Sequence, residues 1–213
     1  MPIFQLSKEL VFPNPLLAED GVLAVGGDLS PERLLLAYRR GIFPWYNEGE
    51  PIIWHAPNPR FVLFPNEFHV SKSLKRLLKQ EKYSFSVNQN FESVIRNCKQ
   101  IERDFQDGTW ITNDMEKAYI ELNKLGFAHS IEVYNKDNVL VGGLYGILLG
   151  KIFFGESMFH LESNTSKLAF HHLMSTFDVE LVDCQVYTEH LESLGAFDIP
   201  IEMFLNLISE NID

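Results

Sequence analysis

The chain has 213 residues, of which 46% are hydrophobic and 22% charged, a composition typical of a globular protein with one large domain or two smaller ones. The 18 basic and 29 acidic residues give a net charge of -11, which globally argues against nucleic acid as a partner. The two cysteines have no metal-type or redox-type spacing, and no apolar run approaches the roughly 20 residues that cross a bilayer. We therefore expect a cytoplasmic protein with no metal, no membrane span and no signal peptide.

Turn-forming residues dominate residues 1–70, which we predict to form a small N-terminal domain. One helix is clear within it, because Ser30 is a good N-cap, Pro31 suits the first turn and Gly41 suits the C-terminal stop. Aromatic loops follow between residues 42 and 60. These loops cannot bury their own side chains, so we expect them to cover part of a second domain.

From residue 71 to residue 213 the pattern changes to alternating helices and strands, which we predict to form that second domain. Helices are predicted near residues 71–80, 90–99, 114–125, 165–176, 189–194 and 201–209. Strands are predicted near residues 85–87, 129–134, 139–149, 151–158 and 179–186. This order of elements predicts an α+β domain built on a mixed sheet.

Two polar residues interrupt the apolar run at residues 181–186. Asp183 and Gln185 are predicted to lie on one face of a strand, because side chains alternate with period two. Burying such groups without partners costs several kcal/mol, so a substrate is one candidate partner. The pair could orient or deprotonate an amine beside a carbonyl. The alternative is a strand end at which Asp183 caps the following turn.

Glu156 interrupts a second apolar run, at residues 154–159. Gly155 beside it indicates a bulge or a close backbone approach within the strand. A carboxylate at this position could anchor a cationic group. The alternative is a solvated glutamate at the exit of a strand.

Four basic residues recur at helical spacing in the helix near residues 71–80. Lys72, Lys75, Arg76 and Lys79 lie at positions i, i+3, i+4 and i+7, which places them on one face. Because clustered positive charge repels itself, the stripe indicates a track for nucleic-acid phosphates. The alternative is an ordinary solvated face.

Large aromatic residues form the last candidate group. They could wall an apolar pocket or stack on nucleobases, and the alternative is that they belong to the core. The group consists of Trp45, Trp54, Trp110, Phe153 and Phe177.

Eight short motifs, in this order along the chain, resemble those of the bacterial leucyl/phenylalanyl-tRNA–protein transferases. The resemblance extends from Gln5 to about Asn206. The motifs are Gly26–Ser30, Arg40–Trp45, Trp54–Arg60, Gly108–Thr112, His129–Val133, Gly142–Gly146, Gly155–Phe159 and Asp183–Val186.

The resemblance implies an enzyme that moves Leu or Phe from aminoacyl-tRNA onto the N-terminal amine of proteins beginning with Arg or Lys, which marks them for degradation. It implies no cofactor and no metal. It also implies a C-terminal domain like the Gcn5-related N-acetyltransferases, with catalytic residues at Glu156, Asp183 and Gln185. The aminoacyl side chain is then expected to bind a pocket lined by Trp45, Trp110, Leu144, Phe153, Leu173, Phe177 and Val182, and the tRNA to contact Lys72, Lys75, Arg76 and Lys79.

Roles within this reaction follow as hypotheses. We expect Asp183 to bind the ammonium group of the acceptor and take its proton, directly or through Gln185 or water, and Glu156 to read the Arg or Lys side chain. Assistance by the tRNA itself is the alternative. Two other functions stay open, a non-catalytic tRNA- or peptide-binding module and a small-molecule N-acyltransferase. The latter favours a glycine-rich pyrophosphate loop, and none precedes the helix near residues 166–176.

Overall fold

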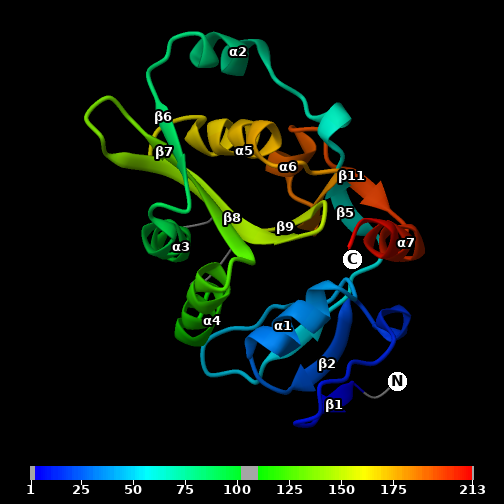
Figure 1. Ribbon diagram of the computed structural model, residues 1–213. Helices are drawn as coiled ribbons and strands as arrows, with labels where there is room; N and C mark the ends of the chain where they lie inside the picture. Colours follow the sequence, from blue (N-terminus) through cyan, green and yellow to red (C-terminus); the bar gives the residue numbers. More distant parts are fainter. Residues whose placement is uncertain (1–2, 102–109, 213) are drawn as a thin grey trace.

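Two β-sheets of unequal size organise the chain in the computed structural model, which describes residues 3–101 and 110–212 (Figure 1). Gly108 and Thr109 of one sequence motif lie outside these ranges, as do the first two residues and the last. The mixture of helices with antiparallel and parallel strands confirms the predicted α+β class.

The small sheet is built from the N-terminal part of the chain. Its strands lie in the order β1 (Phe4–Leu6), β2 (Val22–Gly26), β4 (Ile53–His55) and β3 (Phe43–Pro44). The predicted helix is present as α1 (Pro31–Tyr38), and a short 3-10 helix, η1, spans Pro15–Leu17. Ser30 occupies the N-cap position of α1, but its hydroxyl bonds to Asp28 and makes no capping bond to the helix.

The large sheet has seven strands in the order β11, β5, β10, β9, β8, β7 and β6. Only the β9–β10 pair among these strands is parallel, so the sheet is mixed, as predicted. The strands are β6 (Ser84–Val87), β7 (Ala128–Tyr134), β8 (Leu140–Leu149), β9 (Ile152–His160), β10 (Leu181–Gln185), β11 (Phe197–Ile199) and β5 (Arg60–Leu63).

Strand β5 lies before the predicted domain boundary at residue 70, yet it pairs within the large sheet. It is antiparallel to β10 on one side and to β11 on the other. A 3-10 helix, η2 (Pro65–Glu67), follows it. The N-terminal stretch therefore supplies one interior strand to the sheet that carries the polar residues of interest, and the division at residue 70 stays a prediction.

Helices cover both faces of the large sheet (Figure 1). A side chain at Gly142 of β8 would collide with Thr165 at the start of α5, whereas one at Gly143 would meet Val94 of α3. Because neighbouring residues of a strand point to opposite faces, α5 and α3 lie on opposite sides of β8. The helices are α2 (Lys72–Leu78), α3 (Phe91–Gln100), α4 (Asn113–Lys124), α5 (Thr165–Thr176), α6 (Glu189–Glu192) and α7 (Ile201–Asn211).

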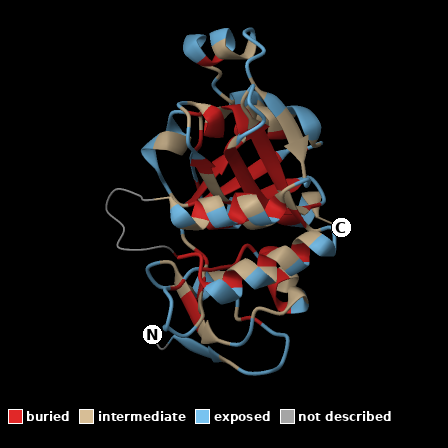
Figure 2. Cartoon of the chain, turned by 90° about the vertical axis from the view of Figure 1, so that its left-hand side faces the viewer, coloured by how far each residue is buried: buried red, intermediate tan, exposed pale blue. Residues whose placement is uncertain are grey.

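Two apolar layers result, one on each face of the large sheet. The central strands β5, β7, β8 and β10 are mostly buried, as the red strands of Figure 2 show, and the alternation within them is weak because both faces are covered. The layer on the α3 side continues through α4 into α1 and the small sheet. Among the described residues, no helix combines the length and apolar character needed to cross a membrane.

Candidate active site

A pocket of about 720 Å³ opens between the aromatic loop that leaves the small sheet and the ends of β9 and β10. One wall is apolar and the other holds polar side chains. The apolar wall includes Phe43, Pro44, Trp45, Trp110, Leu144, Phe153, Phe170 and Val182, and the polar wall includes Glu156, Ser157, Asp183, Gln185 and His190.

Five of the seven residues predicted to bind the aminoacyl side chain line this pocket, and two do not. Leu173 is fully buried and packs in the layer under β9 and β10, and Phe177 is partly buried at the edge of that layer. Phe170 is the residue of α5 that lines the pocket. Leu173 and Phe177 follow Phe170 by about one and two helical turns, so all three lie on the same side of the helix. Of these three residues, only Phe170 lines the pocket.

Glu156 lies on β9 at the centre of a buried polar network. Its Oε1 accepts hydrogen bonds from the Tyr38 hydroxyl at 2.7 Å and from Gln185 Nε2 at 2.8 Å. Its Oε2 accepts one from the Tyr119 hydroxyl at 2.9 Å, and the oxygens of the two tyrosine hydroxyls lie next to each other. Tyr38 comes from α1 and Tyr119 from α4, so three separate parts of the fold meet at one carboxyl group.

This environment changes the acidity of Glu156. Burial raises its pKa to about 7, and the negative charge of Asp183 acts in the same direction. The hydrogen bonds from Tyr38, Tyr119 and Gln185 oppose that rise, because they stabilise the ionised form. Burial and the nearby Glu156 raise the pKa of both tyrosines well above their usual value, so each remains a donor.

Asp183 on β10 forms a bidentate ion pair with Arg60 of β5. Arg60 Nε donates to Oδ1 at 2.8 Å and Nη2 donates to Oδ2 at 2.6 Å, and both side chains are fully buried. The guanidinium carbon lies 4.7 Å from the ring centres of both Phe43 and Phe204. Such stacking stabilises a desolvated cation. The partner that a buried Asp183 requires is therefore Arg60.

Gln185 ends β10 in a left-handed backbone conformation, with φ of +65°, which is uncommon for a residue other than glycine. A register shift between Asp183 and Gln185 interrupts the pairing with β5. The Gln185 N–H donates to Asp183 Oδ1 at 2.9 Å, which holds the turned backbone in place. Cys184 also reaches the pocket, and burial raises the pKa of its thiol, so the sulfur stays protonated.

Sequence reasoning missed three members of this network, namely Arg60, Tyr38 and Tyr119. Arg60 precedes an apolar run of four residues, and a cation at the start of a buried strand needs a carboxylate partner. That signal was present in the sequence. Tyr38 and Tyr119 carry no comparable signal, because an inward-facing tyrosine on a helix is an ordinary core residue.

The remaining candidates are spread over the fold. Trp54 is fully buried and its Nε1 donates to the Gly26 carbonyl at 2.9 Å, so this tryptophan belongs to the core. The four basic residues Lys72, Lys75, Arg76 and Lys79 are exposed on and just after α2, while Leu74 faces inward. Within residues 3–101 and 110–212, no group of three His, Cys, Asp or Glu side chains could hold a metal ion.

Comparisons with known proteins match most of the chain to one protein family. The family described as leucyl/phenylalanyl-tRNA protein transferase matches residues 62–209, and the N-terminal domain of the same family matches residues 27–58. Relatives with that name include one from Syntrophus aciditrophicus, 55% identical over 100% of this chain and 90% of its own length. Another, from Flavobacterium johnsoniae, is 54% identical over 97% of this chain and 99% of its own length.

Solved structures with a distant likeness include L-PGS from Bacillus licheniformis, with a TM-score of 0.44 and 10% identity over 80% of this chain and 55% of that one. A GCN5-related N-acetyltransferase from Kribbella flavida has a TM-score of 0.38 and 10% identity over 79% of this chain and 60% of that one. The full-length sequence matches, together with the pocket described above, establish that the chain belongs to the leucyl/phenylalanyl-tRNA–protein transferase family of aminoacyltransferases.

Proposed function

We propose that this enzyme transfers Leu or Phe from aminoacyl-tRNA to the N-terminal amine of cytoplasmic proteins that begin with Arg or Lys, and so marks them for degradation. One observation carries the proposal: a single pocket joins an apolar wall to a buried carboxylate–amide network. The apolar wall suits the Leu or Phe side chain of the donor. The polar wall suits the amine of the acceptor.

The reaction needs little covalent chemistry from the protein. The amine nitrogen forms a bond to the ester carbonyl carbon, the bond from that carbon to the ribose oxygen breaks, and the proton lost by the amine balances the one gained by the ribose oxygen. The ester is already activated, and an N-terminal amine has a pKa near 7.7–8.0, so both groups are close to reactive at neutral pH. Holding them together supplies roughly 7–11 kcal/mol in the best intramolecular models.

Gln185 is the residue that we place against the amine. Its amide nitrogen is already engaged by Glu156 at 2.8 Å, which leaves the amide oxygen to accept a hydrogen bond from the attacking nitrogen. The bond from the Gln185 N–H to Asp183 fixes the backbone that carries this amide. In this arrangement Gln185 orients the amine, and the proton that the amine loses passes through water to the ribose oxygen that leaves.

The structure changes the role that we propose for Asp183. Both of its oxygens bind Arg60 and the carboxylate is fully buried, so direct contact with an ammonium group would break a buried ion pair. We therefore propose that Asp183 acts through Gln185 as a positioning residue. Asp183→Asn should lower kcat and leave KM for aminoacyl-tRNA nearly unchanged, because Gln185 then loses the contact that holds its backbone. Asp198→Asn, at an exposed position of β11, is the control.

Glu156 is our candidate for reading the Arg or Lys side chain. Three hydrogen bonds occupy it, and an ionised carboxylate has about four acceptor positions, so one position on Oε2 stays available. Glu156→Gln should reduce transfer to an Arg-initiated peptide about ten- to a hundredfold more than transfer to an Ala-initiated peptide. An unchanged ratio between the two peptides would assign the reading to another carboxylate.

The basic residues of α2 are our candidate contact for the tRNA backbone. They are exposed, and α2 packs against α5 through its apolar face. Changing Lys72, Lys75, Arg76 and Lys79 together to Ala should weaken tRNA binding and flatten its salt dependence, by about 0.7–0.9 in the log–log slope for each phosphate that is no longer neutralised. An unchanged slope would mean that this face is only solvated.

The test of the function itself is direct. The purified protein is mixed with labelled Phe-tRNA and an Arg-initiated peptide, with an Ala-initiated peptide as the control, and label in the peptide is measured over time. We expect rapid transfer to the Arg-initiated peptide. Binding of both substrates without transfer would indicate a non-catalytic binding module, and transfer from an acyl thioester in place of the tRNA would indicate a small-molecule N-acyltransferase.

A further inference from the structure

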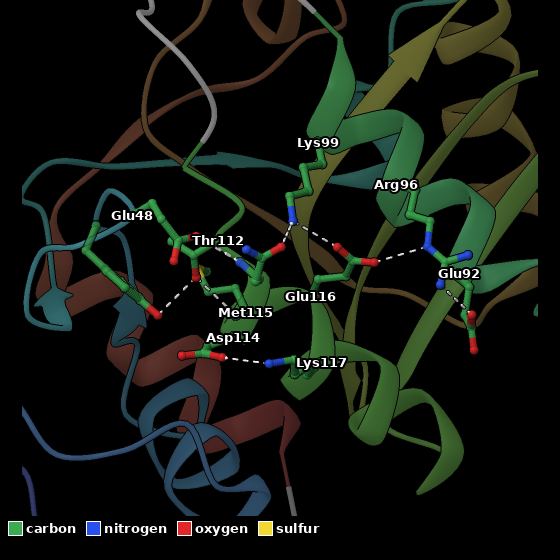
Figure 3. A network of polar contacts seen from close by, with 11 residues as sticks. Glu48, Glu92, Arg96, Lys99, Thr112, Asp114, Met115, Glu116 and Lys117 are labelled. Carbon is green, nitrogen blue, oxygen red and sulfur yellow. Dashed lines mark hydrogen bonds and ion pairs between the residues drawn. The ribbon is translucent and has the colours of Figure 1, made fainter.

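Two hydrogen bonds join the loop that follows β3 to the start of helix α4. The Tyr46 hydroxyl and the Thr112 hydroxyl lie 3.2 Å apart and bond to each other in a buried position. Two residues along the loop, Glu48 Oε2 accepts a hydrogen bond from the backbone N–H of Asn113 at 3.1 Å, as Figure 3 shows beside Thr112. We refer to the pair formed by Tyr46 and Glu48 as the latch.

The start of α4 is also held from its other side. Lys99 of α3 donates to the Asn113 side chain at 2.7 Å and to Glu116 at 2.9 Å (Figure 3). Thr112 caps α4 by accepting a hydrogen bond from the Met115 N–H at 3.2 Å. The latch therefore connects a loop of the small sheet to a fixed point next to the large sheet.

Each end of the latch adjoins a tryptophan of the pocket. Trp45 immediately precedes Tyr46, and Trp110 lies two residues before Thr112. Both line the pocket, and the indole of Trp45, which is 38% exposed, has the ring of His55 as a neighbour at 5.8 Å between ring centres. The backbone of Trp45 is tied to the small sheet, because its N–H donates to the Ile53 carbonyl at 2.9 Å. The latch therefore joins by hydrogen bonds the two segments that carry these indoles.

We propose that Tyr46 and Glu48 are positioning residues that set the spacing of Trp45 and Trp110 for the end of the aminoacyl-tRNA that enters the pocket. The identity of that donor rests on the function proposed above. A latch of this kind acts on binding of the donor, because its residues adjoin the two tryptophans that line the pocket and make no hydrogen bond to Gln185 or Glu156. Its loss raises KM for aminoacyl-tRNA and leaves kcat in place.

Tyr46→Phe tests the buried one of the two bonds, because it deletes the hydroxyl and keeps the ring. We expect KM for aminoacyl-tRNA to rise about three- to tenfold, with kcat within about twofold of the wild type. Glu48→Ala should raise KM by about twofold, because Glu48 is exposed. Tyr83→Phe is the matched control, since it also deletes one phenol hydrogen bond, to Glu162, away from the pocket.

Thr112 provides a rescue test. Thr112→Val removes the hydroxyl that meets Tyr46, and Thr112→Ser keeps it, so the Ser variant should restore the KM that the Val variant loses. Combining Tyr46→Phe with Thr112→Val should raise KM little beyond Thr112→Val alone, because both changes break the same bond. Additive increases would overturn the assignment of this bond to the latch.

Acrylamide quenching of tryptophan fluorescence measures how accessible the indoles are, and it tests the latch without an activity assay. The chain has three tryptophans, and Trp54 is fully buried, so a change in quenching reports on Trp45 and Trp110. We expect stronger quenching in Tyr46→Phe than in the wild type and no change in Tyr83→Phe. Unchanged quenching, or changed quenching with unchanged KM, would overturn the proposal. A wild-type protein without transferase activity would instead contradict the proposed function, and the quenching result would still decide whether the latch positions the indoles.

Discussion

The buried polar site and the charged network across α3 and α4 contain similar chemical groups in different surroundings. In the buried site, Arg60 and Asp183 meet at 2.6 Å with both side chains fully excluded from water. In the α3–α4 network, Arg96 meets Glu92 at 2.8 Å with both side chains 53% exposed (Figure 3). The distances are nearly equal, so distance alone does not rank the two ion pairs.

The exposure of the two ion pairs to water does distinguish their contributions to stability. An exposed pair is screened and contributes about 0–1 kcal/mol to stability, whereas removing one partner of a buried pair costs about 3–5 kcal/mol, because it leaves a buried charge without compensation. Changes to the buried site should therefore affect the stability of the whole fold. Changes to the surface network should instead affect how helices α3 and α4 lie against each other.

The largest expected effect is the loss of Arg60. Arg60→Met keeps much of the apolar stem between Phe43 and Phe204 but leaves Asp183 buried and unpaired. We expect the free energy of unfolding to fall by about 3–5 kcal/mol, measured by urea denaturation. Adding Asp183→Asn to that variant should recover part of the loss, because the unpaired charge is gone. If the free energy of unfolding fell by less than about 1 kcal/mol, the buried ion pair would contribute no more to stability than an exposed one.

The pH dependence of stability tests Glu156. Its pKa rises from 4.5 in the unfolded chain to about 7 in the fold, so between these pH values the folded protein keeps a proton that the unfolded chain has lost. The contribution of Glu156 to stability therefore falls as pH rises from about 4.5 to about 7, by about 3 kcal/mol at most. The stability difference between wild type and Glu156→Gln should shift in favour of the variant over this range. A pH-independent difference would place the Glu156 carboxyl in contact with water.

The tyrosines that bind Glu156 should have a smaller effect. Tyr119→Phe removes one buried hydrogen bond to the carboxyl group and should cost about 1–2 kcal/mol of unfolding free energy. It should also move the Glu156 transition to higher pH, because that bond stabilises the ionised form. Tyr187→Phe is a matched control, since Tyr187 makes a similar bond to Glu192 in an exposed position. If Tyr119→Phe and Tyr187→Phe lowered the free energy of unfolding equally, burial would not be what makes the hydrogen bond to Glu156 important for stability.

The smallest effect is expected on the surface. Arg96→Met removes ion pairs to Glu92 and Glu116 and should change the free energy of unfolding much less than Arg60→Met does. The difference from wild type should shrink further at high salt, because exposed charges are screened. Denaturation at low and high salt measures both. A loss comparable to that of Arg60→Met would mean that the network carries part of the fold.

Local sequence signals predicted much of this fold. Helix α1 begins directly after Ser30, and β8 and β9 match long apolar runs, because caps and periodicity act over a few residues. Such local signals could not predict that β5 pairs within the large sheet. Arg60 and Asp183 are separated by 123 positions, and no local pattern relates residues so far apart.

The candidate site was predicted in part for the same reason. Glu156, Asp183 and Gln185 stood out because polar groups in apolar runs need partners, and the structure brings the three together. Their partners Tyr38 and Tyr119 come from helices whose approach to β9 depends on the whole fold. Leu173 fits an apolar pocket by residue type as well as Phe170 does, and only the packing of α5 distinguishes them.

The position of β5 between β10 and β11 also shapes how the chain is made. During synthesis, β5 is made more than a hundred residues before β10 and β11. Its backbone N–H and C=O groups therefore lack these two partner strands until both have been made. Pairing at such sequence separation is slow, and unpaired strand edges invite association with other chains. The large sheet, and the pocket that it carries, can therefore be completed only after β10 and β11 have been synthesised.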